Sequence, residues 1–76
     1  MITADDIRAL IQENVMGVDA TALGEDDNFQ QAGIDSLDQI NVLLGIEEKH
    51  GYKIPDEDVK LCMSIRGILD YLAAKL

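Results

Sequence analysis

The sequence predicts an all-α protein: a small four-helix bundle of three main helices and one short helix, with a long loop between helices one and two. Three observations support this fold class. Apolar residues recur at three- and four-residue spacing in separate segments, no segment alternates as a strand does, and glycine or proline stands between the segments. The 76 residues suffice for one domain, 1–76, whose core is near the lower limit for unaided folding.

The first helix is expected over roughly residues 3–16. Thr3 is suited to the N-cap, and Asp5 and Asp6 place negative charge in the first turn, where the helix dipole favours it. Gly17 is suited to end the helix. Four apolar residues follow helical spacing within these bounds: Ile7, Leu10, Ile11 and Val15.

Residues 17–35 form a long connection with few periodic apolar positions. A loop of this length is uncommon in so small a domain and is usually functional. Phe29, the only phenylalanine, is expected to fix the loop to the core. The apolar anchors of the loop are Val18, Leu23, Phe29 and Ile34.

The second helix is expected from about Ser36 to His50, with Asp35 or Ser36 as its cap and Gly51 as its stop. His50 is interpreted as a helix-terminus residue, since its protonated form suits the negative end of the helix dipole and no nucleophile or acid is patterned around it. The positions that mark successive turns are Leu37, Ile40, Leu43, Leu44 and Glu47.

A short third helix is expected over roughly residues 56–61, because Pro55 pushes the residue before it out of helical geometry and Asp56 can cap the helix. Ser64 is expected to cap the last helix. One face of that helix is apolar: Ile65, Ile68, Leu69, Leu72 and Leu76.

Two glycines, Gly45 and Gly67, fall inside helical patterns, where each costs about 1 kcal/mol relative to alanine. They indicate either a close approach of helices or space for something held between them.

The charge is strongly acidic and uneven. Fifteen acidic and six basic residues give a net charge of −9, which argues against nucleic acid or an anionic membrane as a partner. Residues 25–58 hold ten acids and two bases, so this segment alone carries −8. The pattern fits a solubilising surface, or an acidic face that attracts basic partner proteins.

Several features predict a cytoplasmic protein. No run of about 18 apolar residues is present, and the first residues lack the basic start and apolar centre of a signal peptide. The single Cys62 cannot form an internal disulfide, which suits a reducing compartment. We expect Cys62 to be a buried thiol.

The residues offer little support for catalysis or for a metal site. One histidine and one cysteine give no ligand spacing for zinc, and Asp26-Asp27-Asn28 lacks the frame of a calcium loop. No glycine-rich phosphate loop occurs. A hydrolase built on Ser36 would need a nearby base, and His50 at a helix end is a weak candidate. The chain is therefore not expected to be an enzyme.

Ser36 lies where an acidic loop meets a helix, a position that suits a cap or a site that another enzyme modifies. The surrounding motif resembles the Asp-Ser-Leu phosphopantetheine attachment motif of acyl carrier proteins: Gly33-Ile34-Asp35-Ser36-Leu37-Asp38. The resemblance continues in register over essentially the whole chain, in segments 28–33, 45–49, 54–58 and 68–72. These read Asn-Phe-Gln-Gln-Ala-Gly, Gly-Ile-Glu-Glu-Lys, Ile-Pro-Asp-Glu-Asp and Ile-Leu-Asp-Tyr-Leu.

The resemblance implies that a phosphopantetheinyl transferase, using magnesium, attaches 4′-phosphopantetheine from coenzyme A to Ser36. The arm would carry acyl groups as thioesters between basic-surfaced synthases and acyltransferases of fatty acid, lipid or polyketide biosynthesis, with the carrier acting as a monomer. The residues implied in partner recognition are Asp35, Leu37, Asp38, Ile40, Glu47, Glu48 and Asp56. Those that could line a space for the acyl chain, or serve as plain core, are Ile40, Leu44, Ile54, Val59, Leu61, Ile68 and Leu69.

The chain departs from the carriers of fatty acid synthesis in three respects. It has Asn41 where they usually place another acid, and His50-Gly51 where they end the helix on an aromatic-acidic pair. Lys49 and Lys53 dilute the acidic face. A general role and a specialised pathway both remain open, with an aminoacyl or peptidyl carrier as a smaller possibility. The alternative from another class is an unmodified acidic helical adaptor that binds basic partner proteins.

Overall fold

The computed structural model describes residues 1–75; Leu76, expected on the apolar face of the last helix, lies outside them. The elements are α1 (Ala4–Asn14), η1 (Ala20–Ala22), α2 (Ser36–His50), η2 (Asp56–Leu61) and α3 (Ile65–Lys75), where η marks a 3₁₀ helix. The predicted all-α class, with three long helices and a short one, is confirmed. The loop also contains η1, which the sequence pattern does not predict.

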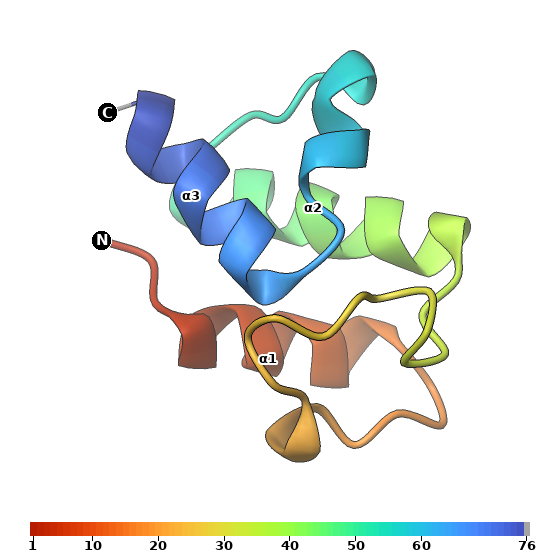
Figure 1. Cartoon of the computed structure of the whole chain (residues 1–76). Coiled ribbons are helices and arrows are strands. Elements are labelled where there is room, and N and C mark those ends of the chain that lie inside the picture. Colours follow the sequence, from red (N-terminus) through yellow and green to blue (C-terminus); the bar gives the residue numbers. More distant parts are fainter. Residues whose placement is uncertain (76) are drawn as a thin grey trace.

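The three long helices pack around one core. Helix α1 lies beside α2 and also contacts α3, and the N-terminus and α3 lie on the same side of the molecule (Figure 1). The core consists of buried apolar side chains from all three helices and the long loop. Within residues 1–75, no helix has the length and apolar character needed to cross a membrane.

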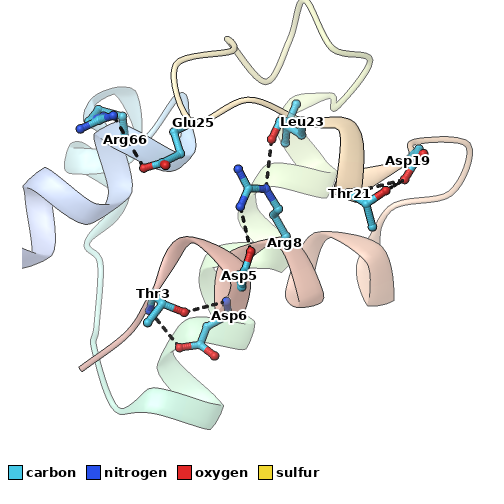
Figure 2. A network of polar contacts seen from close by, with 9 residues as sticks. All are labelled: Thr3, Asp5, Asp6, Arg8, Asp19, Thr21, Leu23, Glu25 and Arg66. Atoms are coloured by element: carbon cyan, nitrogen blue, oxygen red, sulfur yellow. Dashed lines mark hydrogen bonds and ion pairs between the residues drawn. The ribbon is translucent and has the colours of Figure 1, made fainter.

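Helix α1 begins with the predicted cap. The Asp6 amide donates to Thr3 Oγ1 (3.2 Å) and the Thr3 amide donates to Asp6 Oδ2 (2.9 Å), a reciprocal capping box (Figure 2). The amide hydrogen bond from Thr3 holds the pKa of Asp6 below its usual range. The helix ends at Asn14, two residues earlier than expected, because Val15 turns into an extended conformation and is buried in the core. Gly17 follows in the turn, with φ +79.

Helix α2 has the predicted bounds, and the structure decides between its two candidate caps. Asp35 Oδ1 accepts from the Asp38 amide (2.8 Å), so Asp35 is the cap and Ser36 is the first helical residue. At the other end Gly51 adopts the left-handed conformation (φ +79), and its amide donates to the Glu47 carbonyl (3.0 Å).

The short helix η2 is placed as predicted, but its expected cap is wrong. Pro55 occupies the N-cap position without a side-chain hydrogen bond, and Asp56 is already the first helical residue. The fixed φ of proline (−63) starts the turn without help from the Asp56 carboxylate. Ser64 does cap α3: its hydroxyl oxygen accepts from the Gly67 amide (2.9 Å).

Contacts with the helices hold both halves of the long loop in place. Phe29 is buried, as predicted, and its amide donates to the Met63 carbonyl before α3 (2.8 Å). Farther back, Arg66 at the start of α3 pairs with Glu25 (3.7 Å), while Arg8 of α1 donates to the Leu23 carbonyl (3.0 Å), as Figure 2 shows. The loop is thus tied to α1 and α3 before it reaches α2.

The buried face of α2 differs from the expected apolar series. Its members are Gln39, Val42, Leu43 and Ile46. Leu37, Ile40 and Leu44 are instead exposed, because α1 and the remaining core cover the other side of the helix. The apolar residues expected along this helix therefore belong to two different faces, one in the core and one exposed to solvent.

Both helical glycines mark close approaches. A Cβ on Gly45 would lie 3.0 Å from Leu10 Cδ2, which belongs to α1. A Cβ on Gly67 would lie 2.7 Å from the Leu61 carbonyl oxygen. Both glycines therefore mark close packing of neighbouring segments and not a space between helices.

Candidate functional site

Ser36 is held at a defined place by the residues before it. Gly33 takes φ +94, a conformation that L-residues rarely adopt, and so turns the chain toward α2. Ile34 is buried, and its amide donates to the Phe29 carbonyl (2.9 Å). The anchored residue therefore stands two positions before Ser36, whose side chain is exposed.

The surroundings of Ser36 fit a phosphate-bearing group. An open depression of about 320 Å³ adjoins the serine and is lined by Gln30, Gly33, Ile34, Asp35 and Ser36. Ser36 begins a 15-residue helix, and the first amides of a helix have no intrahelical acceptor. The Asp38 amide already donates to the Asp35 carboxylate. The backbone N–H groups of Ser36 and Leu37 therefore point out of the N-terminal end of α2, where the helix dipole favours an anion.

The expected partner-recognition residues lie at different places on and near α2: Ile40, Glu47 and Asp56 line one recess, whereas Glu48 lies in a groove beside α1. Asp35, Glu48 and Asp56 are exposed, whereas Asp38 and Glu47 are half-buried. Leu37 is 68% exposed and Ile40 39%, so both offer apolar contact at the surface. Lys49 does not lie free beside these acids, since its Nζ pairs with Glu13 of α1 at 2.9 Å.

A small recess separates α2 from the segment that contains η2. Its volume is about 30 Å³, room for roughly two water molecules. The lining residues are Ile40, Leu43, Leu44, Glu47, Ile54, Asp56 and Val59. The structure therefore brings together four of the seven residues expected to line an acyl-chain space, and adds Leu43.

The other three expected residues lie elsewhere. Ile68 is fully buried in the core. Leu69 lines a different recess, next to Met1 and Ile2. Leu61 is 54% exposed and is not among the residues that line the recess beside α2.

One residue at this recess was not singled out from the sequence. Gln39 is 2% exposed, the one buried polar side chain among the described residues. Its Nε2 donates to the carbonyls of Cys62 (2.9 Å) and Val59 (3.2 Å). A signal existed: Gln39 stands three residues before Val42 and four before Leu43, on the buried face of α2.

The remaining ionisable groups near η2 serve structure. The Cys62 thiol is buried, as expected. Burial raises the pKa of this thiol to about 11, so it is protonated at neutral pH. The Tyr71 hydroxyl donates to Asp58, which raises the pKa of Tyr71 to about 12. Residues 1–75 hold no group of three or more His, Cys, Asp or Glu side chains placed to bind a metal ion.

Comparison with known proteins agrees with this geometry. Residues 5–72 match the family model described as the phosphopantetheine attachment site. Relatives named acyl carrier protein in Campylobacter jejuni subsp. doylei and Campylobacter jejuni subsp. jejuni are each 33% identical over 73 residues. That alignment covers 95% of this chain and 94% of each relative. The chain belongs to the acyl carrier protein family.

Membership in the family establishes the general role. Acyl carrier proteins are carriers and not enzymes, and their cofactor is phosphopantetheine. The matched region runs from the first turn of α1 into the last turns of α3, so it includes the whole arrangement around Ser36.

Proposed function

We propose that this acyl carrier protein bears 4′-phosphopantetheine on Ser36 and shuttles acyl thioesters between enzymes of fatty acid, lipid or polyketide biosynthesis. The observation that carries the proposal is the position of Ser36: exposed, at the first residue of α2, and released from capping by Asp35. The second serine of the chain, Ser64, is half-buried and accepts from the Gly67 amide.

The residues of the chain prepare the attachment in two ways. The loop anchored by Phe29 and Ile34 presents the Ser36 hydroxyl to a partner transferase. In the transfer, Ser36 Oγ forms a bond to phosphorus, the pyrophosphate bond of coenzyme A breaks, adenosine bisphosphate leaves, and the serine proton passes to the transferase. The amides at the start of α2 then stabilise the phosphodiester anion. When bound, the arm supplies a terminal thiol that holds the acyl group as a thioester.

The surface and the recess supply the remaining parts of the proposal. The acidic residues Asp35, Asp38, Glu47, Glu48 and Asp56 attract basic partner enzymes, and exposed Leu37 and Ile40 add apolar contact. The acyl chain folds into the recess between α2 and η2. We propose that the carrier acts as a monomer in the cytoplasm, where coenzyme A and the transferase are available to it.

An intact-mass experiment tests the attachment site. The wild-type protein is incubated with coenzyme A, magnesium and a broad-specificity phosphopantetheinyl transferase. We expect the mass of one phosphopantetheine to be added to the wild type and to Ser64→Ala, and nothing to be added to Ser36→Ala. An adduct of equal yield on Ser36→Ala would refute the proposal.

The same variant separates a carrier from an acidic adaptor. Because Asp35 is the cap of α2, Ser36→Ala should unfold at nearly the wild-type midpoint, contrary to the loss expected if Ser36 were the cap. Failure of this folded variant to replace the wild type in cells would support a modified carrier. Full replacement would favour the adaptor.

A further inference from the structure

Gln39 joins the two sides of the recess beside α2. It precedes Ile40 and stands one turn before Leu43, both of which line the recess from α2. Its amide reaches the carbonyl of Val59, a lining residue on the opposite side, and the carbonyl of Cys62 just beyond η2. Met63 Sδ lies 3.3 Å from the same nitrogen. A single buried side chain therefore holds both walls.

The two walls differ in how firmly they are attached. Helix α2 buries four side chains in the core, whereas η2 buries none. Half-buried Val59 is the side chain of η2 that packs against the core, and polar contacts add to it: the Gln39 amide from α2 and the Tyr71 hydroxyl of α3, which donates to Asp58. Because apolar burial supplies most of the free energy that holds an element in place, η2 is the wall that can move.

The volume of the recess sets a limit on what enters. About 30 Å³ admits only a few carbon atoms while the walls stay as they are. A longer acyl chain must push η2 away from α2, and the Gln39 hydrogen bonds oppose that movement. Breaking them also removes the Gln39 donor from the buried Cys62 carbonyl, which is unfavourable, whereas the Val59 carbonyl still accepts from the Cys62 amide (2.9 Å).

We propose that Gln39 determines the length of the acyl chain that this carrier can shield, by holding η2 against α2. The inference rests on the proposed attachment of the acyl arm at Ser36. Short chains fit the recess with the Gln39 contacts intact, whereas longer chains stay exposed to solvent until those contacts open.

The test uses the full chain loaded by the transferase from butanoyl-, octanoyl- or dodecanoyl-coenzyme A. The variants are Gln39→Ala and Gln39→Met; methionine is of similar size but lacks the amide donor. The matched control is Asn41→Ala, an exposed position on the same helix. Cleavage of each thioester by hydroxylamine is followed by intact mass, since a shielded thioester reacts more slowly.

We expect the octanoyl thioester to be cleaved about three- to tenfold more slowly in both Gln39 variants than in the wild type, the factor by which one lost hydrogen bond shifts an opening equilibrium. The butanoyl rate should stay close to that of the wild type, and Asn41→Ala should behave as wild type at every length. A role in stability alone would not produce this dependence on chain length.

Identical chain-length profiles in the wild type and both variants would overturn the inference. Failure of both variants to fold would overturn it too, because Gln39 would then belong to the essential core and not to a movable wall. If the wild type accepts no acyl arm, the proposed function itself fails, and this result is recognised before any cleavage is measured.

Discussion

The core of the three long helices and the segment η2 are built on different interactions. The long helices meet through fully buried apolar side chains, among them Ile7, Ile11, Ile46, Ile65 and Ile68. Helix η2 contributes no fully buried residue: half-buried Val59 packs against the core, and hydrogen bonds from Gln39 and Tyr71 hold the segment further. A small carrier thus combines a rigid frame, which positions Ser36, with one wall whose attachment is weak enough to open.

The largest loss of stability should come from a substitution in the apolar core. Phe29→Ala removes a side chain that is 1% exposed and anchors the loop before Ser36, so we expect a loss of about 3–5 kcal/mol in the free energy of unfolding. Chemical denaturation measures it. Leu37→Ala, at an exposed position, is the control and should stay within about 0.5 kcal/mol of wild type. Equal losses for the two would contradict a core centred on Phe29.

A smaller effect should appear where η2 meets α3. Gly67→Ala places a Cβ 2.7 Å from the Leu61 carbonyl oxygen, a backbone atom, so η2 or α3 must shift at a cost of about 1–3 kcal/mol. Thermal unfolding measures the change. Gly45→Ala is the matched comparison, because its Cβ meets the movable end of the Leu10 side chain at 3.0 Å. We expect Gly45→Ala to be close to neutral, and a neutral Gly67→Ala would show that η2 adapts without cost.

The smallest effect should come from the polar contact between Tyr71 and Asp58. Tyr71→Phe should lower the midpoint of thermal unfolding less than Gly67→Ala, because one partly solvated hydrogen bond is lost. Its stabilisation should also depend on pH. Since the pKa of Tyr71 is raised to about 12 in the folded protein, the contribution is complete below pH 10 and disappears as pH rises through 12.

The wild type should therefore lose stability over that pH range more steeply than Tyr71→Phe. Tyr52→Phe serves as a control for the loss of a tyrosine hydroxyl. If the wild type and Tyr71→Phe lost stability in parallel, Tyr71 would not stabilise η2 through Asp58.

Features that depend on neighbours along the chain could be read from the sequence. The Thr3 cap of α1, the bounds of α2 and its stop at Gly51 all involve residues within one turn of one another. Where two neighbouring residues suit the same position, the sequence left the choice between them open. Asp35 and Ser36 both suit a cap, and the extended backbone of Asp35 placed its carboxylate on the Asp38 amide.

One part of the candidate site could be predicted from the sequence and another part could not. The position of Ser36 at the start of α2 followed from the sequence, because helix starts are set locally. The residues that line the recess did not follow from the sequence pattern. Ile40, Leu44, Ile54 and Val59 meet there. Ile68 and Leu69 have a similar apolar pattern, but Ile68 lies in the core and Leu69 lies beside the N-terminus. Periodicity gives the faces of each helix but not which face the neighbours cover.

The sequence by itself thus determined an acidic all-α domain with a serine at the head of its second long helix. Only the tertiary structure decided that Leu37 and Ile40 face solvent and that Gln39 ties α2 to η2. The physical reason is distance along the chain. The Gln39 contacts join residues 20 to 24 positions apart, and no local preference fixes such a pair before the core has packed.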